Sequence, residues 1–479
     1  MTANRDNLQK PKIGLMLFLT DRLRAIGEGE PGGTYAVVAE AYAKSVVEEL
    51  GTDIEWVFPG FICNREELAN AMARFVTERT DGVVAIHLSW TEDFNWIRFL
   101  RDMPPCPVML ACVVRDQLNF DVVSMGDGTF TQAMAACNVV GILEASGSIE
   151  RMGRPNVEVC AGTAGQLRSR IGEWALAARA AARLRSSTMG LLGGYNEVMW
   201  STYVDPYDVF SRIGPEIRFL GLNGLLEQMD NVDDGQVKLA CDKALRDFRA
   251  SMPIDREKLE ASMRASMGFE LLGAQYNLDL MVYNDVDAFM LRGLGLRPGF
   301  LRMYDGRMIT VPEGDIGSGV AAFVLHALTG RAVHYIEPFF IDRERQCLVA
   351  GHSGPSNYDQ GEGKCLLCND LRFASADIRY PAAPMAWYVF PAGRYTLLHF
   401  SQGKGRYKMV TGQVDVLDSE HFYASYHHGR IRPVSMDAQR FVEKLTEIQV
   451  TQHFCLAAGD CRQQIRYLAK MQGFELFEL

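Results

Sequence analysis

The sequence predicts an α/β protein in three parts: two Rossmann-like, doubly wound domains with parallel sheets, then a β-rich, barrel-like C-terminal domain. Three observations support this prediction. The chain has 479 residues, roughly three times the usual length of a domain. Short apolar runs alternate with amphipathic helical patterns up to about residue 330, and short β-rich runs replace them beyond it. We therefore place the domains at residues 1–163, 164–330 and 331–479.

Composition and charge exclude several classes of partner. The net charge of −10 and the pI near 5.5 argue against nucleic acid or an anionic membrane. The eleven cysteines are odd in number and lack a framework spacing, which indicates reduced thiols. The polar N-terminus has no apolar signal region, and no apolar run is long enough to span a bilayer. We expect a cytoplasmic protein.

The first domain opens with a nearly all-apolar run, typical of a strand in a parallel sheet that is covered on both faces. Its glycine-rich segment, GEGEPGG, lacks the G-x-G-x-x-G register and a P-loop lysine, so we interpret it as an active-site or interface loop. The GDGTF segment at 126–130 is a turn or a loop at the carboxyl edge of the sheet. We expect strands at 13–19, 54–58, 82–88 and 107–113, and helices at 34–50 and after Asn64 as an N-cap.

The second domain repeats this alternation. A long helix over residues 165–186 leads into it, and it ends near residue 330 with the helix that follows Glu313, where Gly330 gives a C-terminal stop. Strands are predicted at 189–194, 217–222 and 278–284, and helices at 205–213, 234–250 and 255–276.

The third domain has the pattern of an antiparallel barrel or sandwich. Turn residues separate its β-rich runs, and two helices close the chain at about 437–447 and 462–471. The β-rich runs are at 332–341, 347–352, 385–390, 395–401 and 407–417.

Three residues between positions 311 and 354 have the side chains of a divalent-metal site: Glu313 at a helix start, Glu337 in a strand-like run and His352 after an apolar strand. Two carboxylates and an imidazole suit a hard-to-borderline cation. Each also has an ordinary explanation. A glutamate is favoured at a helix start by the helix dipole, Glu337 beside Pro338 fits a solvent-facing position on an edge strand, and histidines are common in turns.

Two other groups carry reactive side chains. His427 and His428 are adjacent and point to opposite faces of a strand, so at most one of them can join a site. Cys365 and Cys368 form a lone C-x-x-C without a second pair or a suitably spaced histidine. The role of this cysteine pair stays open.

Four motifs follow one another along the second half of the chain: the PEGD helix start with its apolar run ending in TGR; HYIEPFF, whose glutamate follows 24 positions after Glu313; GHSG, whose histidine follows 15 positions later; and the ending TQHFCLAAGDCRQQIRYLAKMQGFE. In this order they resemble the L-fucose/L-arabinose isomerases, a family of metal-dependent aldose–ketose isomerases. The likeness covers essentially the whole chain, whose length is closer to the arabinose enzymes.

The resemblance implies a metal shell of Glu313, Glu337, His352 and His453, with Mn²⁺ the usual ion, or another divalent cation. It implies that the two glutamates are also the acid/base pair. It further implies a homo-oligomer, a hexamer or tetramer, in which a neighbouring subunit completes each pocket. The chain departs from the arabinose enzymes at Gln452, where they have a histidine, and around Glu337 and the N-terminal sugar-contacting positions. The sugar, a pentose or a 6-deoxyhexose, therefore stays open.

The chemistry of such a site follows from the reaction. Aldose–ketose interconversion through a cis-enediol takes a proton from one carbon and places one on its neighbour. A divalent cation beside the two sugar oxygens acidifies that C–H bond, and two carboxylates can exchange the protons. The carboxyl ends of parallel strands are where α/β domains bind ligands. Candidates for sugar contacts at such ends are Trp90, Gln132, Tyr195, Asn196, Tyr283 and Asn284, with Gln452 beside the last ligand.

Two alternatives to this function stay open. One is an isomerase of a related sugar, such as D-arabinose, with the same site. The other is a non-catalytic sugar-binding protein, because two α/β lobes also suit a hinged binding module. That alternative predicts no metal and no need for Glu313 and Glu337 together.

Overall fold

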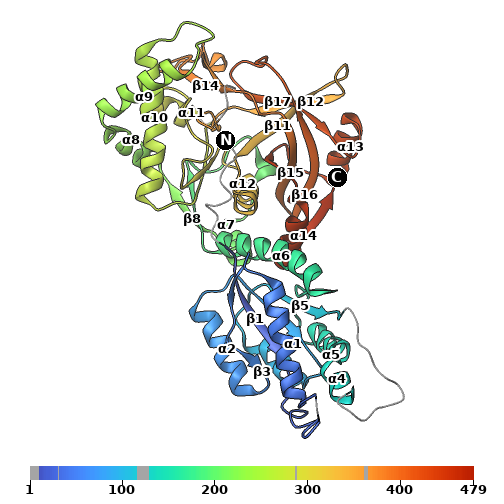
Figure 1. Ribbon diagram of the computed structural model, residues 1–479. Helices are drawn as coiled ribbons and strands as arrows, with labels where there is room; N and C mark the ends of the chain where they lie inside the picture. The colour runs from blue at the N-terminus through green and yellow to red at the C-terminus, as the bar shows by residue number, and fades with distance from the viewer. Residues whose placement is uncertain (1–9, 31, 116–128, 286–287, 361–364) are drawn as a thin grey trace. The chain divides into compact units, whose positions relative to one another are not determined.

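The computed structural model describes residues 10–30, 32–115, 129–285, 288–360 and 365–479 (Figure 1). The chain forms two compact units. The N-terminal unit extends to Ala182 and takes in Gln463–Gly473, and the C-terminal unit holds Arg183–Arg462 and Phe474–Leu479. The three domain boundaries drawn from the sequence stay predictions. Within the described ranges, no helix has both the length and the apolar character needed to cross a membrane.

The N-terminal unit is built on a parallel sheet, as its alternating sequence pattern predicts. Six strands of the described chain form it, in the order β2-β1-β4-β5-β6, with β3 also paired to β1. β1, β4 and β5 are buried along nearly their whole length, because a sheet covered on both faces has no solvent side. The strands are β1 (Lys12–Phe18), β2 (Glu55–Val57), β3 (Phe61–Ile62), β4 (Gly82–His87), β5 (Val108–Val113) and β6 (Glu158–Gly162).

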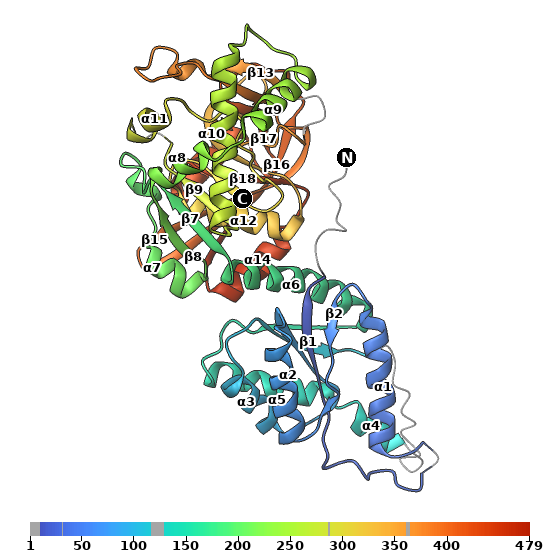
Figure 2. The same ribbon diagram turned by 90° about the vertical axis from the view of Figure 1, so that its left-hand side faces the viewer.

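Helices cover this sheet on both faces. α2, α3 and α5 place Phe75, Trp96 and Ile142 in one core, and α1 lies on the opposite side of β1 (Figure 2). The predicted cap of α2 is confirmed: Asn64 accepts two backbone N–H groups, and Glu67 closes a capping box. The helices with most of their residues here are α1 (Tyr35–Leu50), α2 (Arg65–Thr77), α3 (Asp93–Asp102), α4 (Thr129–Ala135), α5 (Asn138–Arg151), α6 (Ala164–Arg185) and α14 (Arg462–Gln472).

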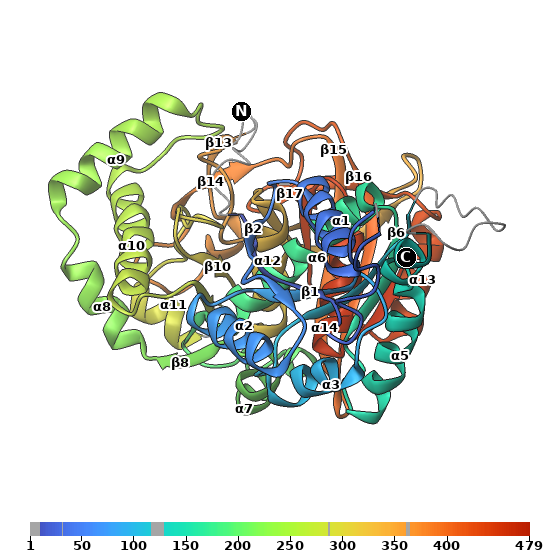
Figure 3. The ribbon, with the colours of Figure 1, turned by 60° about the horizontal axis from the view of Figure 1, so that its bottom comes forward.

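The C-terminal unit contains a second parallel sheet, in the order β10-β9-β7-β8. α8 and α10 pack against it, with Leu225, Phe269 and Leu272 joining Leu192 and Met281 in one core. α9 runs beside α10 (Figure 3). The elements are β7 (Thr188–Leu192), η2 (Trp200–Thr202), α7 (Pro206–Asp208), the π-helical turn η3 (Val209–Ile213), β8 (Glu216–Leu220), α8 (Leu222–Asp230), α9 (Asp234–Asp247), α10 (Arg256–Gln275), β9 (Leu280–Tyr283), α11 (Ala288–Leu294) and β10 (Ile309–Val311).

The β-rich part of the chain forms a closed antiparallel barrel, one of the two architectures that its pattern predicts. The strand order is β15-β18-β11-β12-β17-β16, and pairing of β15 with β16 closes the ring. Alternate residues such as Ile336, Leu397, Val414 and Leu456 fill the barrel core. The strands and helices in this part of the chain, within and outside the barrel, are β11 (Val333–Asp342), β12 (Cys347–His352), β13 (Cys365–Asn369), η4 (Leu371–Phe373), β14 (Pro384–Tyr388), β15 (Gly393–Gly403), β16 (Arg406–Leu417), β17 (His427–Pro433), α13 (Ala438–Ile448), β18 (Phe454–Ala458) and β19 (Glu475–Glu478).

One helix, α12 (Ile316–Thr329), contacts both the second sheet and the barrel (Figure 1). It is buried on nearly every side, as expected for a helix that is apolar all round. Small residues allow its close packing: a Cβ at Gly317 would lie 2.6 Å from the Phe400 carbonyl oxygen, and one at Gly319 would lie 2.8 Å from the Val282 side chain. The N-terminus of α12 is therefore held at the junction of sheet and barrel.

Some expectations are corrected. The sequence did not indicate α8 or α11, because helices of nine and seven residues are too short to show a sustained helical period. The helix after Glu313 begins at Ile316 with Asp315 as its cap, so Glu313 is in the preceding loop rather than in the helix. Two predicted loops are only partly within the described residues: Pro31 of the glycine-rich segment and residues 126–128 of GDGTF lie outside them.

Candidate metal centre

Four side chains that are far apart in the sequence come together in the C-terminal unit. One ligand atom from each of Glu313, Glu337, His352 and His453 lies within 4.8 Å of the others. These are the four residues that the sequence motifs predict as a metal shell, and we call them the Glu–His cluster.

Glu313 reaches the cluster from a strained turn after β10. Glu313 (φ 66°) and Gly314 (φ 67°) both have left-handed backbone conformations, which cost a glutamate about 1–2 kcal/mol. Two hydrogen bonds hold the turn. The Gly314 N–H donates to the Tyr283 carbonyl (2.9 Å), and the Glu313 N–H donates to Asp285 Oδ1 (3.2 Å). Strain of this kind is typical of functional sites, where the surrounding structure over-determines the conformation.

The other three cluster residues lie in or next to barrel strands that neighbour each other in the order β18-β11-β12: His453 directly precedes β18, Glu337 is within β11 and His352 ends β12. Ile336 pairs with Phe454, which sets Glu337 opposite His453, and Glu337 pairs with Gly351, next to His352. The register therefore places Glu337, within β11, between His453 just before β18 and His352 at the end of β12. β11 pairs with β18 up to Ile336 and with β12 from Glu337 onward, so it is not an edge strand of the sheet, and Pro338 lies at a register shift. The side chain of Glu337 is nevertheless 25% exposed.

The spacing between ligand atoms fits a small divalent cation. His453 Nε2 is 3.0 Å from Glu313 Oε2 and 3.5 Å from Glu337 Oε1, and His352 Nε2 is 3.4 Å from Glu313 Oε1 and 3.8 Å from Glu337 Oε2. Adjacent ligands bound at about 2.1 Å to an octahedral ion are about 3 Å apart. A modest contraction of the cluster would therefore give the required geometry.

Three of these atoms are buried and have no hydrogen-bond partner outside the cluster: Glu313 Oε2, His352 Nε2 and His453 Nε2. Burying a polar atom without a hydrogen-bond partner lowers the stability of the folded protein. Two carboxylates and two imidazoles that converge in this way could satisfy these buried atoms by binding a borderline divalent metal. The residues present therefore fit such an ion.

A second layer of contacts orients both imidazoles. His453 Nδ1 is 2.8 Å from Asp315 Oδ2, and His352 Nδ1 is 2.6 Å from the Ser353 carbonyl oxygen. With Nδ1–H donated outward, each Nε2 lone pair faces the cluster, which is how metal-binding histidines are usually held.

The charges of the cluster are strongly coupled. Burial alone would raise the pKa of the Glu313 carboxyl, but His352 and His453 outweigh it and hold that pKa well below its usual range. Burial alone would lower the pKa of His453, but Asp315, Glu313 and Glu337 raise it well above the ordinary value. Without a cation, a proton on His453 supplies a positive charge beside the carboxylates of Asp315, Glu313 and Glu337.

Four predicted sugar contacts lie at the carboxyl edge of the second sheet, beside the loop of Glu313: Tyr195, Asn196, Tyr283 and Asn284. A Cβ at Gly314 would lie 3.0 Å from the Asn196 nitrogen, and Asn284 Nδ2 donates to the Tyr195 carbonyl at 3.0 Å. The buried atoms Asn196 Nδ2 and Asn284 Oδ1 have no partner, so both amides can still bind a ligand. The Tyr195 hydroxyl is already used, since it donates to the Val204 carbonyl at 2.5 Å.

The remaining predicted sugar contacts lie elsewhere. Gln452 is next to His453, and its Nε2 is 3.4 Å from Met199 Sδ. Trp90 and Gln132 belong to the N-terminal unit. Trp90 Nε1 donates to Glu144 (2.8 Å), and Gln132 is exposed on helix α4 rather than in the expected loop. A sugar-binding role for these three stays a prediction.

Several site residues were not predicted. Asp315 is two positions from Glu313 and was overlooked because a helix cap explains it fully. Tyr335 packs against the rings of His352 (4.6 Å between centroids) and His453 (5.0 Å), and its buried hydroxyl has no partner. The alternation of β11, which places Tyr335 and Glu337 on one face, is the signal that would have indicated it.

The other reactive groups of the sequence are outside the cluster. The ring of His427 contacts the Gly354 carbonyl (2.7 Å), and His428 accepts the Phe422 N–H (3.2 Å). Cys365 and Cys368 are in β13, and burial raises the pKa of each thiol to about 12. These thiols are therefore protonated at neutral pH and poor nucleophiles.

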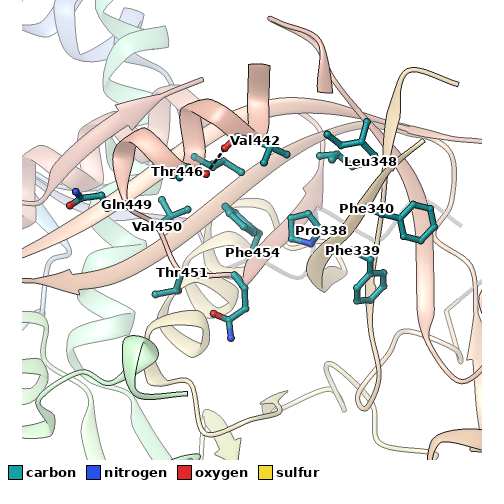
Figure 4. Close-up of a pocket in the computed structure, with 13 residues that line it drawn as sticks. Pro338, Phe339, Phe340, Leu348, Val442, Thr446, Gln449, Val450, Thr451 and Phe454 are labelled. Atoms are coloured by element: carbon teal, nitrogen blue, oxygen red, sulfur yellow. Dashed lines mark hydrogen bonds between the residues drawn. The ribbon is translucent and has the colours of Figure 1, made fainter. Parts of the chain in front are cut away.

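A pocket of about 690 Å³ opens between β11 and α13, and most of its lining is apolar (Figure 4). It shares no residue with the Glu–His cluster, but Pro338 and Gln452 are sequence neighbours of Glu337 and His453. It is lined by Pro338, Phe339, Phe340, Ile341, Leu348, Val442, Leu445, Thr446, Gln449, Val450, Thr451, Gln452 and Phe454.

Comparison of the chain with protein-family models and with curated proteins finds no match. The resemblance to the L-fucose/L-arabinose isomerases therefore depends on the four motifs alone.

Proposed function

We propose that this protein is a metal-dependent aldose–ketose isomerase that acts on a pentose or a 6-deoxyhexose of the L-arabinose/L-fucose type. The observation that carries the proposal is the convergence of Glu313, Glu337, His352 and His453 from four separate segments, with buried ligand atoms that have no partner outside the cluster. The order of the sequence motifs supports the same reaction.

The four cluster residues would hold Mn²⁺ or another divalent cation. When bound, such a cation polarises the two sugar oxygens and stabilises the negative charge that develops on them. His352 and His453 would bind it through Nε2, which would require both imidazoles to be neutral in the loaded protein.

The two carboxylates suit different tasks. The Glu313 side chain is only 8% exposed and its pKa is lowered, so it stays ionised and serves mainly as a ligand. The Glu337 side chain is 25% exposed, which makes it the accessible carboxylate of the cluster. Glu337 is the better candidate to take the proton from carbon, with Glu313 completing the acid/base pair.

A sugar hydroxyl would accept a hydrogen bond from the free Asn196 Nδ2, and another would donate one to the free Asn284 Oδ1. Gln452 adds a third amide next to His453. Trp90, Gln132 and Tyr195 complete the proposed set, and a homo-oligomer, hexamer or tetramer, in which a neighbouring subunit contributes to the pocket belongs to the same proposal.

The cluster also bears on the two alternatives. An isomerase of a related sugar, such as D-arabinose, would use the same four residues and differ only in its hydroxyl contacts. A non-catalytic sugar-binding protein has no use for two carboxylates and two oriented imidazoles at one point, so the geometry favours the enzyme.

The decisive experiment measures ketose formation from a panel of aldopentoses and 6-deoxyhexoses, with the protein loaded with Mn²⁺, stripped by chelator, and reloaded. We expect turnover of at least one sugar, lost on stripping and restored on reloading, with about one ion bound per chain. Absence of both turnover and bound metal would refute the proposal. Binding of sugars without metal would instead support the sugar-binding alternative.

A further inference from the structure

Two buried charged residues outside the Glu–His cluster connect the loops that carry Glu313 and His352. Asp285 follows β9, and Arg297 lies between α11 and β10. Their side chains form an ion pair and are only 2% and 3% exposed, respectively. Buried ion pairs often add little net stability, because desolvation opposes their attraction. The pair is therefore better explained by its contacts to the loops of Glu313 and His352 than by the stability it adds.

Asp285 holds the backbone of Glu313. Its Oδ2 pairs with Arg297, and its Oδ1 accepts the Glu313 N–H at 3.2 Å. This hydrogen bond is made to a residue with a left-handed backbone, and so it helps to fix a conformation that a glutamate would otherwise leave.

Arg297 reaches the other loop. Its Nη2 lies 3.5 Å from the Ser353 carbonyl oxygen, the same oxygen that is 2.6 Å from His352 Nδ1. Arg372, which pairs with Asp370 (2.9 Å), donates to the Ser353 hydroxyl. Ser353 is thus held from two sides, and the group that orients His352 is anchored to Arg297.

We propose that Asp285 and Arg297 are a positioning pair that fixes Glu313 relative to His352 and thereby sets the affinity of the cluster for its divalent cation. The inference rests on the proposed function, because it needs the cluster to bind metal. One chain of contacts runs from the Glu313 N–H through Asp285, Arg297 and the Ser353 carbonyl to the His352 ring. This chain maintains the 3.4 Å separation of His352 Nε2 and Glu313 Oε1.

The test is Mn²⁺ binding by calorimetry to the full-length protein and to the variants Asp285→Asn, Arg297→Lys and Asp285→Asn/Arg297→Met. We expect each variant to bind Mn²⁺ about 10- to 100-fold more weakly, the usual effect of removing groups that orient metal ligands. The matched control is Glu270→Gln, which breaks the Arg302–Glu270 pair (2.8 Å) elsewhere in the same unit and should change the Kd less than twofold.

The double variant separates positioning from the burial of an unpaired charge. It removes both charges, so its metal-free unfolding temperature should be closer to the native value than that of Asp285→Asn, while its Mn²⁺ binding stays weak. Arg297→Lys keeps the charges balanced and tests the guanidinium geometry by itself. If Asp285→Asn/Arg297→Met and Arg297→Lys both bound Mn²⁺ with Kd values within twofold of native, the inference would be overturned and the proposed function would stay intact. If the native protein bound no Mn²⁺, both would be overturned.

Discussion

His453 Nδ1 and Asp315 Oδ2 lie 2.8 Å apart, and the same Asp315 carboxylate caps α12 by accepting the Ser318 N–H at 2.9 Å. One side chain therefore fixes both the first turn of the central helix and the ring of a proposed metal ligand. The helix start and the barrel strand β18 are coupled through this carboxylate.

Replacing Asp315 should weaken metal binding through this contact. In Asp315→Asn an amide replaces the carboxylate beside His453, so the ring loses the charged acceptor that orients it. We expect Mn²⁺ to bind about 10- to 100-fold more weakly, measured by calorimetry. Asp437→Asn is the matched control, because Asp437 caps α13 in the same way without touching the cluster residues. Equal Kd values for Asp315→Asn and the control would contradict the role given to Asp315.

Metal binding should release a proton. In the metal-free protein the pKa of His453 is raised by Asp315, Glu313 and Glu337 against the effect of burial, and a ligand nitrogen must be deprotonated. Mn²⁺ affinity should therefore rise with pH until His453 is neutral before binding. Calorimetry in buffers of different ionisation enthalpy should show about one proton released per ion near neutral pH. A binding enthalpy independent of the buffer would mean that His453 is already neutral.

The same shifts predict how the stability of the metal-free protein depends on pH. Because the pKa of His453 is raised by folding, its contribution is complete below the unfolded value of about 6.5 and is lost as pH rises through the folded value. Because the pKa of Glu313 is lowered, its contribution is complete above about pH 4.3 and is lost in stronger acid. Stability from this pair should be greatest between about pH 4.3 and 6.5. Unfolding temperatures of the native protein and His453→Gln across pH 4–9 check this, and parallel curves would contradict it.

The two carboxylates should be distinguishable by mutation. Glu337→Gln should lower kcat by about 10²- to 10⁴-fold, the range for loss of a general acid or base, with a smaller effect on metal affinity. Glu313→Gln should abolish turnover and weaken Mn²⁺ binding more, since Glu313 is the more deeply buried ligand. Glu344→Gln, an exposed carboxylate between β11 and β12, is the matched control. Near-normal turnover in either cluster variant, with the fold intact by circular dichroism, would refute the assignment.

Gly351 gives a prediction about the strand that carries His352. A Cβ at this position would lie 2.0 Å from the His427 carbonyl oxygen, so Gly351→Ala must push β12 away from β17. We expect a loss of about 1–3 kcal/mol in denaturant unfolding, together with weaker Mn²⁺ binding. Gly224→Ala in α8 is the control, because its nearest contact would be 3.8 Å and alanine favours helix. A Gly351→Ala protein as stable as this control would show that the strands adjust freely.

Much of the fold could be predicted from local pattern. All-apolar runs predicted buried parallel strands, and Asn64 predicted the start of α2. The change from helical periodicity to short β-rich runs beyond Arg331 predicted a barrel or a sandwich, and the structure forms a barrel. The errors occurred where local pattern is weak. Glu313 was placed at the start of a helix that begins three residues later. For Glu337, an edge strand was the ordinary explanation left open, whereas β11 lies between β18 and β12. Strand order, which decides that β11 is central, depends on pairings between distant segments.

The sequence by itself determined which side chains are available: two glutamates and two histidines in motifs of recognisable order, with an ordinary explanation for each taken alone. Only the tertiary structure decided that they meet. That meeting requires the register of β18, β11 and β12, a left-handed turn at Glu313, and α12 held by both the second sheet and the barrel. Packing also decides how the rings of His352 and His453 are oriented, and it forms the contact of Asp315 with His453 and the Asp285–Arg297 pair. These partners become neighbours only in the folded chain.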